Sequence, residues 1–405
     1  MDYLFLHTGF PNQWQHLARS LAAEPGNRVV LATAAAHARV PGVEIVQLRP
    51  HRDVSLRTHH YSRGLEMAVL TGQAAWRALA PLKQDGFAPA IVGAHAGWGT
   101  GLFMRDLFPD ARLLGYFEWF YDGHGPTSEA VNDRPPSEDD RMFLRMKNAP
   151  IVQDMVNSHR GLAPTRFQRD QFPALYRPHL SVIHDGIDTA LFAPAAEARP
   201  SLRLPGLDLS SAGEILTYVC RGMEPMRGFP QLMRALARLQ QRRPRLHAVI
   251  VGGEAVVYGR ALPDGRSYRQ KMLAELPLDA ERLHFTGPLP YDAYRACLRA
   301  GDVHVYLSRP YVLSWSLLES MSLGALVVGA DCTPVREVMR DEVNGLLADM
   351  EDPDILAARI EAALERPDRG RDLREAARET ITRHYDLRDC LAARRRLLQT
   401  MLEGD

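Results

Sequence analysis

Short apolar runs alternate with longer helical patterns along the whole of this 405-residue sequence, and no other feature constrains its fold as strongly. Strands that alternate with helices indicate βαβ units and a mostly parallel sheet. In the first half, helical patterns cover Gln13–Ala23 and Ser62–Lys83. The strand candidates there are Tyr3–Leu6, Val29–Ala32, Ile45–Gln47, Ala90–Gly93, Leu113–Phe117 and Ser181–Ile183.

The second half repeats this alternation. Its strand candidates are Ile215–Cys220, Leu246–Val251, His284–Thr286, Val303–Leu307 and Leu326–Gly329, and its helix candidates are Gly228–Gln241, Ser316–Leu323 and Pro353–Glu365. A break near Asp185–Asp188 precedes a Pro- and Ala-rich stretch, Ala193–Ser211, which is typical of a linker and surface loop. We therefore predict two doubly wound domains, 1–186 and 187–385, and a basic amphipathic helix over about 386–405 that packs back on the first. Because ligands bind outside the carboxyl ends of such strands, we expect the chemistry in a cleft where the two domains face each other.

Composition narrows the class of protein. Lys plus Arg and Asp plus Glu are both 49, and this zero net charge gives no case for nucleic-acid binding. The four cysteines, at 220, 297, 332 and 390, form no CxxC pair, which excludes a zinc ribbon and fits a reducing cytoplasm. The N-terminal segment lacks the pattern of a signal peptide, and no run reaches the roughly 18 apolar residues of a membrane helix. The sequence leaves peripheral contact with a membrane surface as an alternative, because one small patch is sufficient for it.

Two arginines flank a Gly- and Pro-bearing loop after the strand at 215–220. Arg221 follows that strand, and Arg227 precedes Gly228 at the start of a helix. Guanidinium groups donate in a planar fork to phosphate oxygens, and a helix start adds unpaired N–H groups. The pattern indicates a diphosphate site. The alternative is that both are surface arginines that pair with nearby acids such as Glu224.

A second loop, Arg309–Gly324, also connects a strand to a helix. The backbone amides around Leu313, Ser314, Trp315 and Ser316 could hold a phosphate or sugar hydroxyls. Glu319 is expected in the first turn of that helix, where it could accept hydrogen bonds from ribose hydroxyls. Ser316 and Glu319 also match a capping box, which needs no ligand. Without other context the capping box is the stronger interpretation, and the two roles do not exclude each other.

Weaker signals lie elsewhere in the chain. The strand at 246–251 ends in Gly252-Gly253, which permits close approach to a backbone but is equally explained by a turn. His51, His59 and His60 lie in an Arg-rich loop without a carboxylate at ligand spacing, so we predict no metal site there.

Two segments of the first half follow strands and carry polar and aromatic residues. The first, after strand one, brings His7, Gly9, Phe10, Gln13 and Trp14 toward the predicted cleft. It does not match GxGxxG, so it does not predict a dinucleotide site.

The second segment is Gly115–Gly125, where Glu118 and His124 stand among aromatic residues. Apolar walls with few polar groups are typical of ligand clefts. A carboxylate there could meet a sugar hydroxyl or a developing positive charge, and the alternative is a structural Glu or His at a strand end.

Taken together, these segments resemble glycosyltransferase family 4, whose members have the two-domain GT-B fold. The likeness runs over nearly the whole chain and is strongest from Ser181 to Asp349. It rests on the stretches that follow: Val182–Asp188 with Phe192; Arg221 and Arg227-Gly228; Thr286-Gly287-Pro288; Leu317–Gly324; Pro334–Glu337; and Asn344–Leu346. The resemblance implies that the two arginines bind a diphosphate, that Thr286–Pro288 lie beside the base, and that Glu319 binds ribose. His7–Pro11 and Gly115–Tyr121 resemble a subgroup with an HxxFP segment.

Two residues depart from the family pattern. Tyr311 stands where the family has a Glu that contacts the donor sugar, and Glu118 stands where a His is usual. The resemblance implies that Glu118 or His124 takes over the contact of that His. It also makes Tyr311 a candidate for setting the choice of donor sugar.

The resemblance implies a retaining hexosyltransferase that uses a nucleotide-diphosphate-sugar, with UDP favoured, and that needs neither metal nor cofactor. Arg221 and Arg227 would stabilise the leaving diphosphate. The acceptor, a glycan, a lipid-linked sugar or a small natural product, would bind near His7, Gly9, Phe10, Gln13, Trp14 and Glu118. Two alternatives remain: an inactive sugar-nucleotide-binding or scaffold protein, and a GT-B enzyme that epimerises or phosphorolyses sugars.

Overall fold

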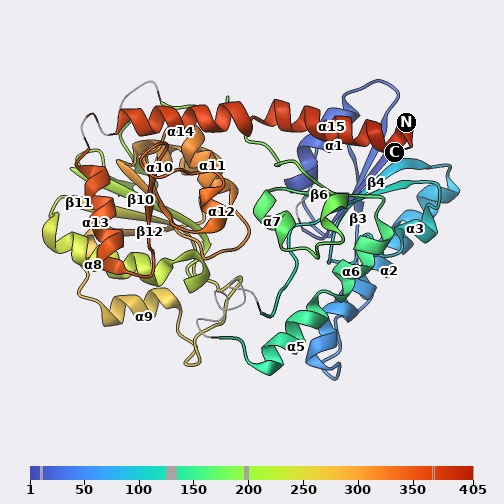
Figure 1. The fold of residues 1–405 in the computed structure, drawn as a ribbon, viewed down its shortest axis with the longest axis horizontal. Coiled ribbons are helices and arrows are strands. Elements are labelled where there is room, and N and C mark those ends of the chain that lie inside the picture. Colours follow the sequence, from blue (N-terminus) through green and yellow to red (C-terminus); the bar gives the residue numbers. More distant parts are fainter. Residues whose placement is uncertain (10–11, 125–134, 196–199, 367, 369, 405) are drawn as a thin grey trace. The chain divides into compact units, whose positions relative to one another are not determined.

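A computed structural model describes residues 1–9, 12–124, 135–195, 200–366, 368 and 370–404, and Figure 1 shows its ribbon. The chain divides into two compact units. Unit 1 consists of Met1–Gly125, Pro136–Asp185 and Arg388–Asp405, and unit 2 consists mainly of Gly186–Leu387. Each unit has its own core of aromatic and aliphatic side chains, so the two units are described separately.

Unit 1 is built on a seven-stranded sheet in which every strand pair is parallel, with the order β3-β2-β1-β4-β5-β6-β7. Its strands are β1 (Asp2–His7), β2 (Arg28–Thr33), β3 (Glu44–Gln47), β4 (Pro89–His95), β5 (Arg112–Tyr116), β6 (Arg160–Ala163) and β7 (Leu180–Val182). Its helices are α1 (Asn12–Ala22), α2 (Arg63–Gln84), α3 (Met104–Leu107), α5 (Glu138–Lys147), α6 (Ala149–Asn157) and α7 (Arg166–Asp170), with short 3-10 turns at His60–Ser62 and Arg177–His179.

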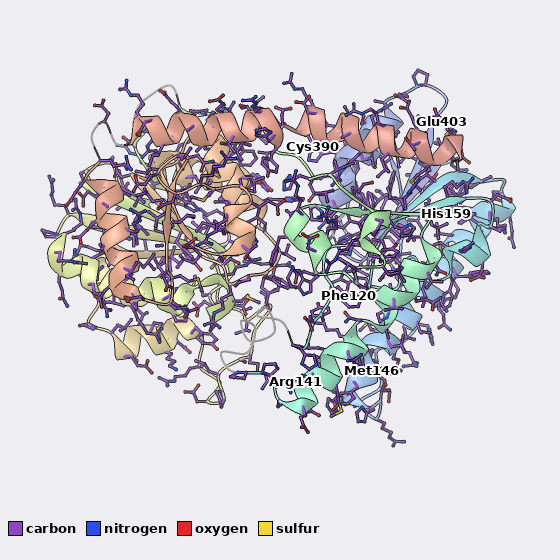
Figure 2. The ribbon with its side chains drawn as sticks, viewed as in Figure 1. Phe120, Arg141, Met146, His159, Cys390 and Glu403 are labelled. Atoms are coloured by element: carbon purple, nitrogen blue, oxygen red, sulfur yellow. The ribbon has the colours of Figure 1, made fainter. Side chains whose placement is uncertain are left out.

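Two apolar layers hold this sheet between helices. Alternate residues of β1 face opposite sides, so that Phe5 lies in a cluster with α1 and Leu4 in a cluster with α2. The part of helix α15 (Leu387–Glu403) that belongs to unit 1 adds Leu398 and Met401 to the α1 side. Cys390 and Glu403 mark the two ends of that part in Figure 2. A C-terminal segment thus completes the core of the N-terminal unit.

Unit 2 repeats the architecture with a six-stranded parallel sheet in the order β12-β11-β10-β13-β14-β15. Its strands are β10 (Glu214–Gly222), β11 (Leu246–Gly253), β12 (Leu283–Gly287), β13 (Val303–Tyr306), β14 (Val327–Ala330) and β15 (Leu346–Ala348). Its helices are α8 (Phe229–Arg242), α9 (Tyr268–Glu275), α10 (Tyr291–Ala300), α11 (Trp315–Ser322), α12 (Thr333–Arg336), α13 (Pro353–Leu364) and α14 (Arg371–His384), with 3-10 turns η3 (Pro225–Arg227) and η4 (Ala280–Arg282).

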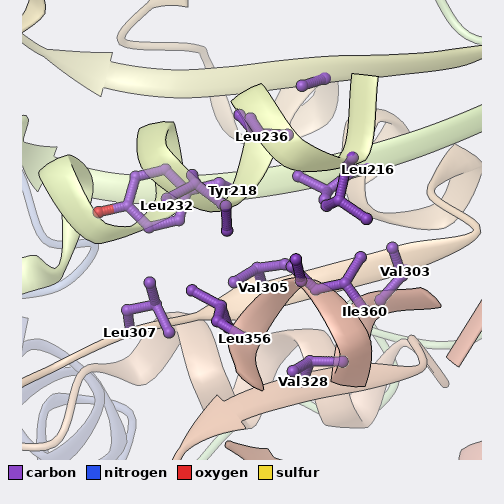
Figure 3. Close-up of a cluster of buried hydrophobic side chains, with 14 of the residues drawn as sticks. Leu216, Tyr218, Leu232, Leu236, Val303, Val305, Leu307, Val328, Leu356 and Ile360 are labelled. Carbon is purple, nitrogen blue, oxygen red and sulfur yellow. The ribbon is translucent and has the colours of Figure 1, made fainter. Parts of the chain in front are cut away.

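The largest core of unit 2 lies between its sheet and two helices. Tyr218 of β10 and Val305 of β13 face Leu232 of α8 and Leu356 of α13, as Figure 3 shows. These side chains are almost completely buried. The packing fixes the carboxyl ends of β10 and β13, which is where both predicted donor loops begin.

The expected linker at Ala193–Ser211 is only partly a loop. Its later part forms a short antiparallel hairpin, β8 (Arg203–Leu204) and β9 (Leu207–Asp208). Leu202 and Leu209 flank this hairpin and are buried in a core cluster of unit 2. These two leucines were not predicted as core residues, because the stretch around them has the composition of a surface loop. Two further short strands, β6 and β15, were also not predicted. No helix in the described part of the chain is long and apolar enough to cross a membrane.

Candidate functional site

Arg227 is a buried cation at the carboxyl end of the unit 2 sheet. Its side chain is only 7% exposed, and its Nη1 donates to Ser308 Oγ at 2.8 Å and to the Val312 carbonyl at 3.3 Å. Its guanidinium carbon lies 5.2 Å from the centre of the Tyr258 ring. Within the described ranges no carboxylate forms an ion pair with it. A buried charge without a counter-ion is costly, so this position favours an anionic ligand.

Arg221 lies near the end of β10, and its side chain is exposed. Among the residues that the structure describes, no hydrogen bond or ion pair engages its guanidinium. Glu224, the acid considered as a partner for both arginines, binds backbone N–H groups of residues 257–259 instead. Among the described residues, both guanidinium groups therefore lack a carboxylate partner at this edge of the sheet.

Glu319 is buried within helix α11. The expectation that it lies in the first turn of the helix was wrong, and the alternative of a capping box with Ser316 does not hold either. The helix begins at Trp315, and its cap is Ser314, whose side chain accepts the Ser316 N–H. Glu319 is therefore the fifth helical residue and lies beyond the first turn. It accepts a hydrogen bond of 2.8 Å from the Tyr294 hydroxyl, and burial raises its pKa to about 7. Tyr291 is hydrogen-bonded to the same carboxyl group. A carboxyl group with two neutral hydroxyl partners still has lone pairs that can accept from further hydroxyl groups.

The amides ahead of α11 are less available than the sequence predicts. The Ser314 N–H donates to the Tyr306 hydroxyl at 3.0 Å, and the Ser316 N–H is used by the cap. Leu313 is 6% exposed and belongs to a core cluster. These contacts order the loop internally, so the two arginines, rather than these amides, carry the case for anion binding.

The remaining donor-side residues lie at neighbouring strand ends. Gly252 has φ of 136°, and a Cβ there would approach the Cys220 carbonyl oxygen to 1.9 Å. Close contact between β10 and β11 is thus sufficient to explain that glycine. Thr286 and Gly287 end β12, ahead of Pro288, and the Thr286 hydroxyl donates to the Gly287 carbonyl at 2.9 Å. Gly253 pairs with Gly222 in the sheet.

Tyr311 stands next to a second tyrosine. Its ring centre lies 5.4 Å from that of Tyr258, with the planes inclined at 59°. Tyr258 belongs to the segment after β11 and was not singled out from the sequence. The sequence signal was weak, because an aromatic residue in a long polar loop has no helical or strand context.

In unit 1, three polar side chains gather at the carboxyl ends of β1, β4 and β5. His7 and His95 pack edge to face with ring centres 5.0 Å apart, and His95 Nε2 lies 3.7 Å from Glu118 Oε2. Burial lowers the pKa of His7 to about 3 and that of His95 to about 4. Both imidazoles are therefore neutral at pH 7. His95 was missed because the predicted strand Ala90–Gly93 stopped two residues before its true end.

Trp98 lies beside this cluster and is 52% exposed. Its ring centre is 6.5 Å from that of His95. Its loop is held by the Asp154 carboxylate, which accepts the Gly97 N–H at 2.7 Å, and by Asn157, which donates to the Leu102 carbonyl at 3.1 Å. An exposed aromatic ring on a well-anchored loop is available for a ligand.

The other acceptor-side predictions have mixed outcomes. Trp14 is completely buried in the core between Phe5 and Tyr116, so its assignment to the acceptor site was wrong. Trp14 turns inward because it lies on the apolar face of the amphipathic helix α1. Gly9 donates its N–H to His7 Nδ1 at 3.0 Å. Phe10 lies outside the described residues.

Gln13 joins the cluster formed by His7, His95 and Glu118, because its side chain is hydrogen-bonded to His7. Gln13 is partly buried, and its carbonyl accepts a hydrogen bond from Arg394. His124 is exposed, and its backbone N–H binds Asp122. No group of three potential metal ligands occurs in the part of the chain that is described.

Comparison with protein families matches both units. The model of the "glycosyl transferase family 4 group" covers residues 25–192, and that of the "glycosyl transferases group 1" covers residues 209–380. The D-inositol 3-phosphate glycosyltransferase of Acidothermus cellulolyticus is 30% identical over 233 residues, which are 53% of this chain and 49% of that protein. The enzyme of the same name from Salinispora tropica is 31% identical over 198 residues, 47% of this chain and 40% of that protein. These matches span half or less of the length of the curated relatives.

Solved structures share the fold over the full chain. Sucrose-phosphate synthase from Thermosynechococcus elongatus superposes with a TM-score of 0.74 at 17% identity and covers 100% of both chains. Anabaena Alr3699/HepE, solved in complex with UDP-glucose, gives 0.71 at 15% identity and covers 99% of this chain and 100% of that one. With the two parallel-sheet units and the two family matches, these findings assign the chain to glycosyltransferase family 4, with the GT-B fold.

Proposed function

We propose that the chain is a retaining glycosyltransferase that moves a sugar from a nucleotide-diphosphate donor to an acceptor hydroxyl. One observation carries this proposal: buried Arg227 and exposed Arg221 stand without a carboxylate partner, among the described residues, at the carboxyl end of β10. Ligands of open parallel sheets bind at that edge. A diphosphate supplies the missing negative charge, and arginine is well shaped to bind it.

A UDP-sugar is the donor that we favour. The family likeness favours UDP, and HepE was solved with UDP-glucose. Glu319 would bind the ribose, because its carboxyl group is buried and keeps acceptor capacity beyond its bonds to Tyr294 and Tyr291. The loop of Thr286, Gly287 and Pro288 would lie beside the base.

The proposed chemistry needs positive charge rather than a metal. The bond between the anomeric carbon and the donor phosphate oxygen breaks, and a bond to the acceptor oxygen forms on the same face. The acceptor proton passes to the leaving phosphate oxygen. Arg221 and Arg227 would stabilise the negative charge that develops on that phosphate, which is preorganised electrostatic catalysis.

We place the acceptor on unit 1, against Glu118, His95 and Trp98. Glu118 would accept a hydrogen bond from an acceptor hydroxyl, and neutral His95 would donate or accept another. The exposed ring of Trp98 would stack on the apolar face of a sugar. These three groups favour a sugar-containing acceptor over a purely aliphatic one.

The test is the variant Arg227→Met, which keeps the apolar stem of the side chain and removes the charge. Turnover of UDP-glucose should fall by about 100-fold or more, as for the loss of one oxyanion-stabilising group. Arg238→Met, on the outer face of α8, is the matched control and should keep full turnover. Near-normal turnover by Arg227→Met would refute the diphosphate assignment. NMR of the product's anomeric proton tests retention.

A second candidate is a sugar-nucleotide-binding protein without turnover, and Tyr311 favours it because the family places a sugar-contacting Glu there. Calorimetric binding of UDP-glucose without product from a panel of glycan, lipid-linked and small-molecule acceptors would support that alternative. Sugar release that depends on inorganic phosphate would instead indicate a phosphorylase.

A further inference from the structure

The carboxylate of Glu224 is completely buried in the loop between the two arginines. It accepts N–H groups from three consecutive residues: Val257 at 3.1 Å, Tyr258 at 3.1 Å and Gly259 at 2.6 Å. A buried carboxylate is stable only when hydrogen bonds compensate for its lost hydration. These three N–H groups belong to one short segment, residues 257–259, and the carboxylate therefore fixes that segment in place.

Further contacts fix the same segment. A Cβ at Gly222 would lie 2.3 Å from the Ala255 carbonyl oxygen, so only glycine permits the segment to approach β10 this closely. At its far side, Glu254 accepts a hydrogen bond of 2.9 Å from the Ser267 hydroxyl and pairs with Arg269 at 2.7 Å. The segment after β11 is thus anchored at several points.

The residue that this anchoring positions is Tyr258. Its ring lies 5.2 Å from the Arg227 guanidinium carbon and 5.4 Å from the centre of the Tyr311 ring. A cation over an aromatic face is attracted by the ring quadrupole, and an arginine shielded from water attracts an anion more strongly. Tyr258 therefore packs against the Arg227 guanidinium group, and its ring forms an aromatic wall together with that of Tyr311.

We propose that Tyr258 is a donor-binding residue and that Glu224 is the residue that positions it. The Tyr258 ring shields Arg227 and, with Tyr311, offers an aromatic wall to the sugar diphosphate. Glu224 does not touch the donor and acts only through the segment at 257–259. This inference rests on the proposed donor site around Arg227.

A double-mutant cycle on the full-length chain tests the proposal. The dissociation constant of UDP-glucose is measured by calorimetry for the wild type, Glu224→Gln, Tyr258→Ala, the double variant and Tyr258→Phe. Tyr258→Ala should weaken binding on the order of ten-fold, which corresponds to about 1.4 kcal/mol. Tyr258→Phe keeps the ring and removes the hydroxyl that is hydrogen-bonded to Arg227, so it should bind more tightly than Tyr258→Ala.

Glu224→Gln should weaken binding about as much as Tyr258→Ala, and the double variant should be no weaker than Tyr258→Ala alone. This non-additivity distinguishes positioning from a general structural role, which would give additive losses. Glu275→Gln, at an exposed position of α9 outside this segment, is the matched control and should bind like the wild type. If Glu224→Gln does not fold, Gly222→Ala displaces the segment with the carboxylate intact and should show the same loss.

The outcomes separate this inference from the proposed function. If the wild type binds UDP-glucose and Tyr258→Ala binds equally well, the inference is wrong and the proposed function stands. Additive losses in the double variant would also overturn the role of Glu224. If the wild type binds none of UDP-, GDP-, ADP- and dTDP-glucose, the proposed function fails and the inference fails with it.

Discussion

Arg394 of helix α15 forms a buried ion pair with Asp185, although the two residues are 209 positions apart in the sequence. Their side chains are 4% and 6% exposed. The Tyr116 hydroxyl donates to the same carboxylate at 3.1 Å, and Arg394 also donates to the Gln13 carbonyl at 2.8 Å. The C-terminal helix is thus tied to Tyr116 at the end of β5, two residues before Glu118.

Removing one partner of this pair should destabilise unit 1 strongly. Arg394→Met leaves Asp185 buried without a cation, which costs about 3–5 kcal/mol in known buried pairs. Arg396→Met, an exposed position on the same helix, should cost close to nothing. Urea unfolding monitored by tryptophan fluorescence measures both. Equal stability of the two variants would contradict the structural role of the pair.

Acidification should weaken unit 1 through His95. Its pKa is lowered from 6.5 to about 4 by burial, so the unfolded chain binds the proton more readily than the folded one. Stability is therefore fully present above pH 6.5 and is lost as the pH falls toward 4, by about 1.4 kcal/mol per pH unit for one proton.

The measurement is urea unfolding from pH 7 to 4 for the wild type and His95→Gln. The variant should lose stability less steeply with falling pH. The difference between the two is needed because Asp154, whose pKa is raised to about 7, has the opposite dependence. Parallel pH profiles for the two proteins would contradict a lowered pKa of His95 in the folded state.

Trp98→Ala should raise the acceptor KM, with little change in the donor KM, because the ring is proposed to stack on the acceptor sugar. A lost aromatic contact of about 1.4 kcal/mol corresponds to a ten-fold change. Trp76→Ala is the matched control, since that ring is 37% exposed on helix α2. Steady-state kinetics with each substrate varied gives the answer. An unchanged acceptor KM for Trp98→Ala would remove this residue from the acceptor site.

Tyr311→Glu should change the order of preference in a panel of nucleotide sugars. A carboxylate can accept hydrogen bonds from sugar hydroxyls, whereas a tyrosine ring offers an apolar wall and one hydroxyl. Relative kcat/KM values for UDP-glucose, UDP-galactose and UDP-N-acetylglucosamine measure the change. Tyr311→Phe serves as the control for the ring alone. The same ranking in wild type and Tyr311→Glu would mean that this position does not select the donor.

EDTA should leave transferase activity unchanged, because the two arginines are proposed to supply the positive charge that a metal would otherwise provide. Activity is compared with and without EDTA, and again after addition of Mg²⁺. Arg221→Met combined with the same treatment checks the premise, since added Mg²⁺ should not rescue a lost guanidinium group. Loss of wild-type activity in EDTA that Mg²⁺ restores would refute metal independence.

Periodicity alone was sufficient for most of the fold. Apolar runs such as those that became β1, β10 and β13 were predicted to within two residues at either end, because a strand buried on both faces is a continuous apolar run. The arginines at 221 and 227 could likewise be read from their place after a strand. The hairpin at 203–208 could not, because its stability depends on two leucines that find partners only in the folded core.

The sequence by itself determined the two parallel-sheet units, the family and the loops that carry the charged groups, since all three follow from local pattern and short motifs. Only the tertiary structure decided which side chains meet. Trp14 became core, because helix α1 turns that face to the sheet, while His95 and Trp98 came to stand beside Glu118. Tyr258 reached Arg227 because a buried carboxylate, Glu224, needed three backbone N–H groups from a segment more than 30 residues away. Contacts of this kind depend on burial and distance in space, which residue order does not encode locally.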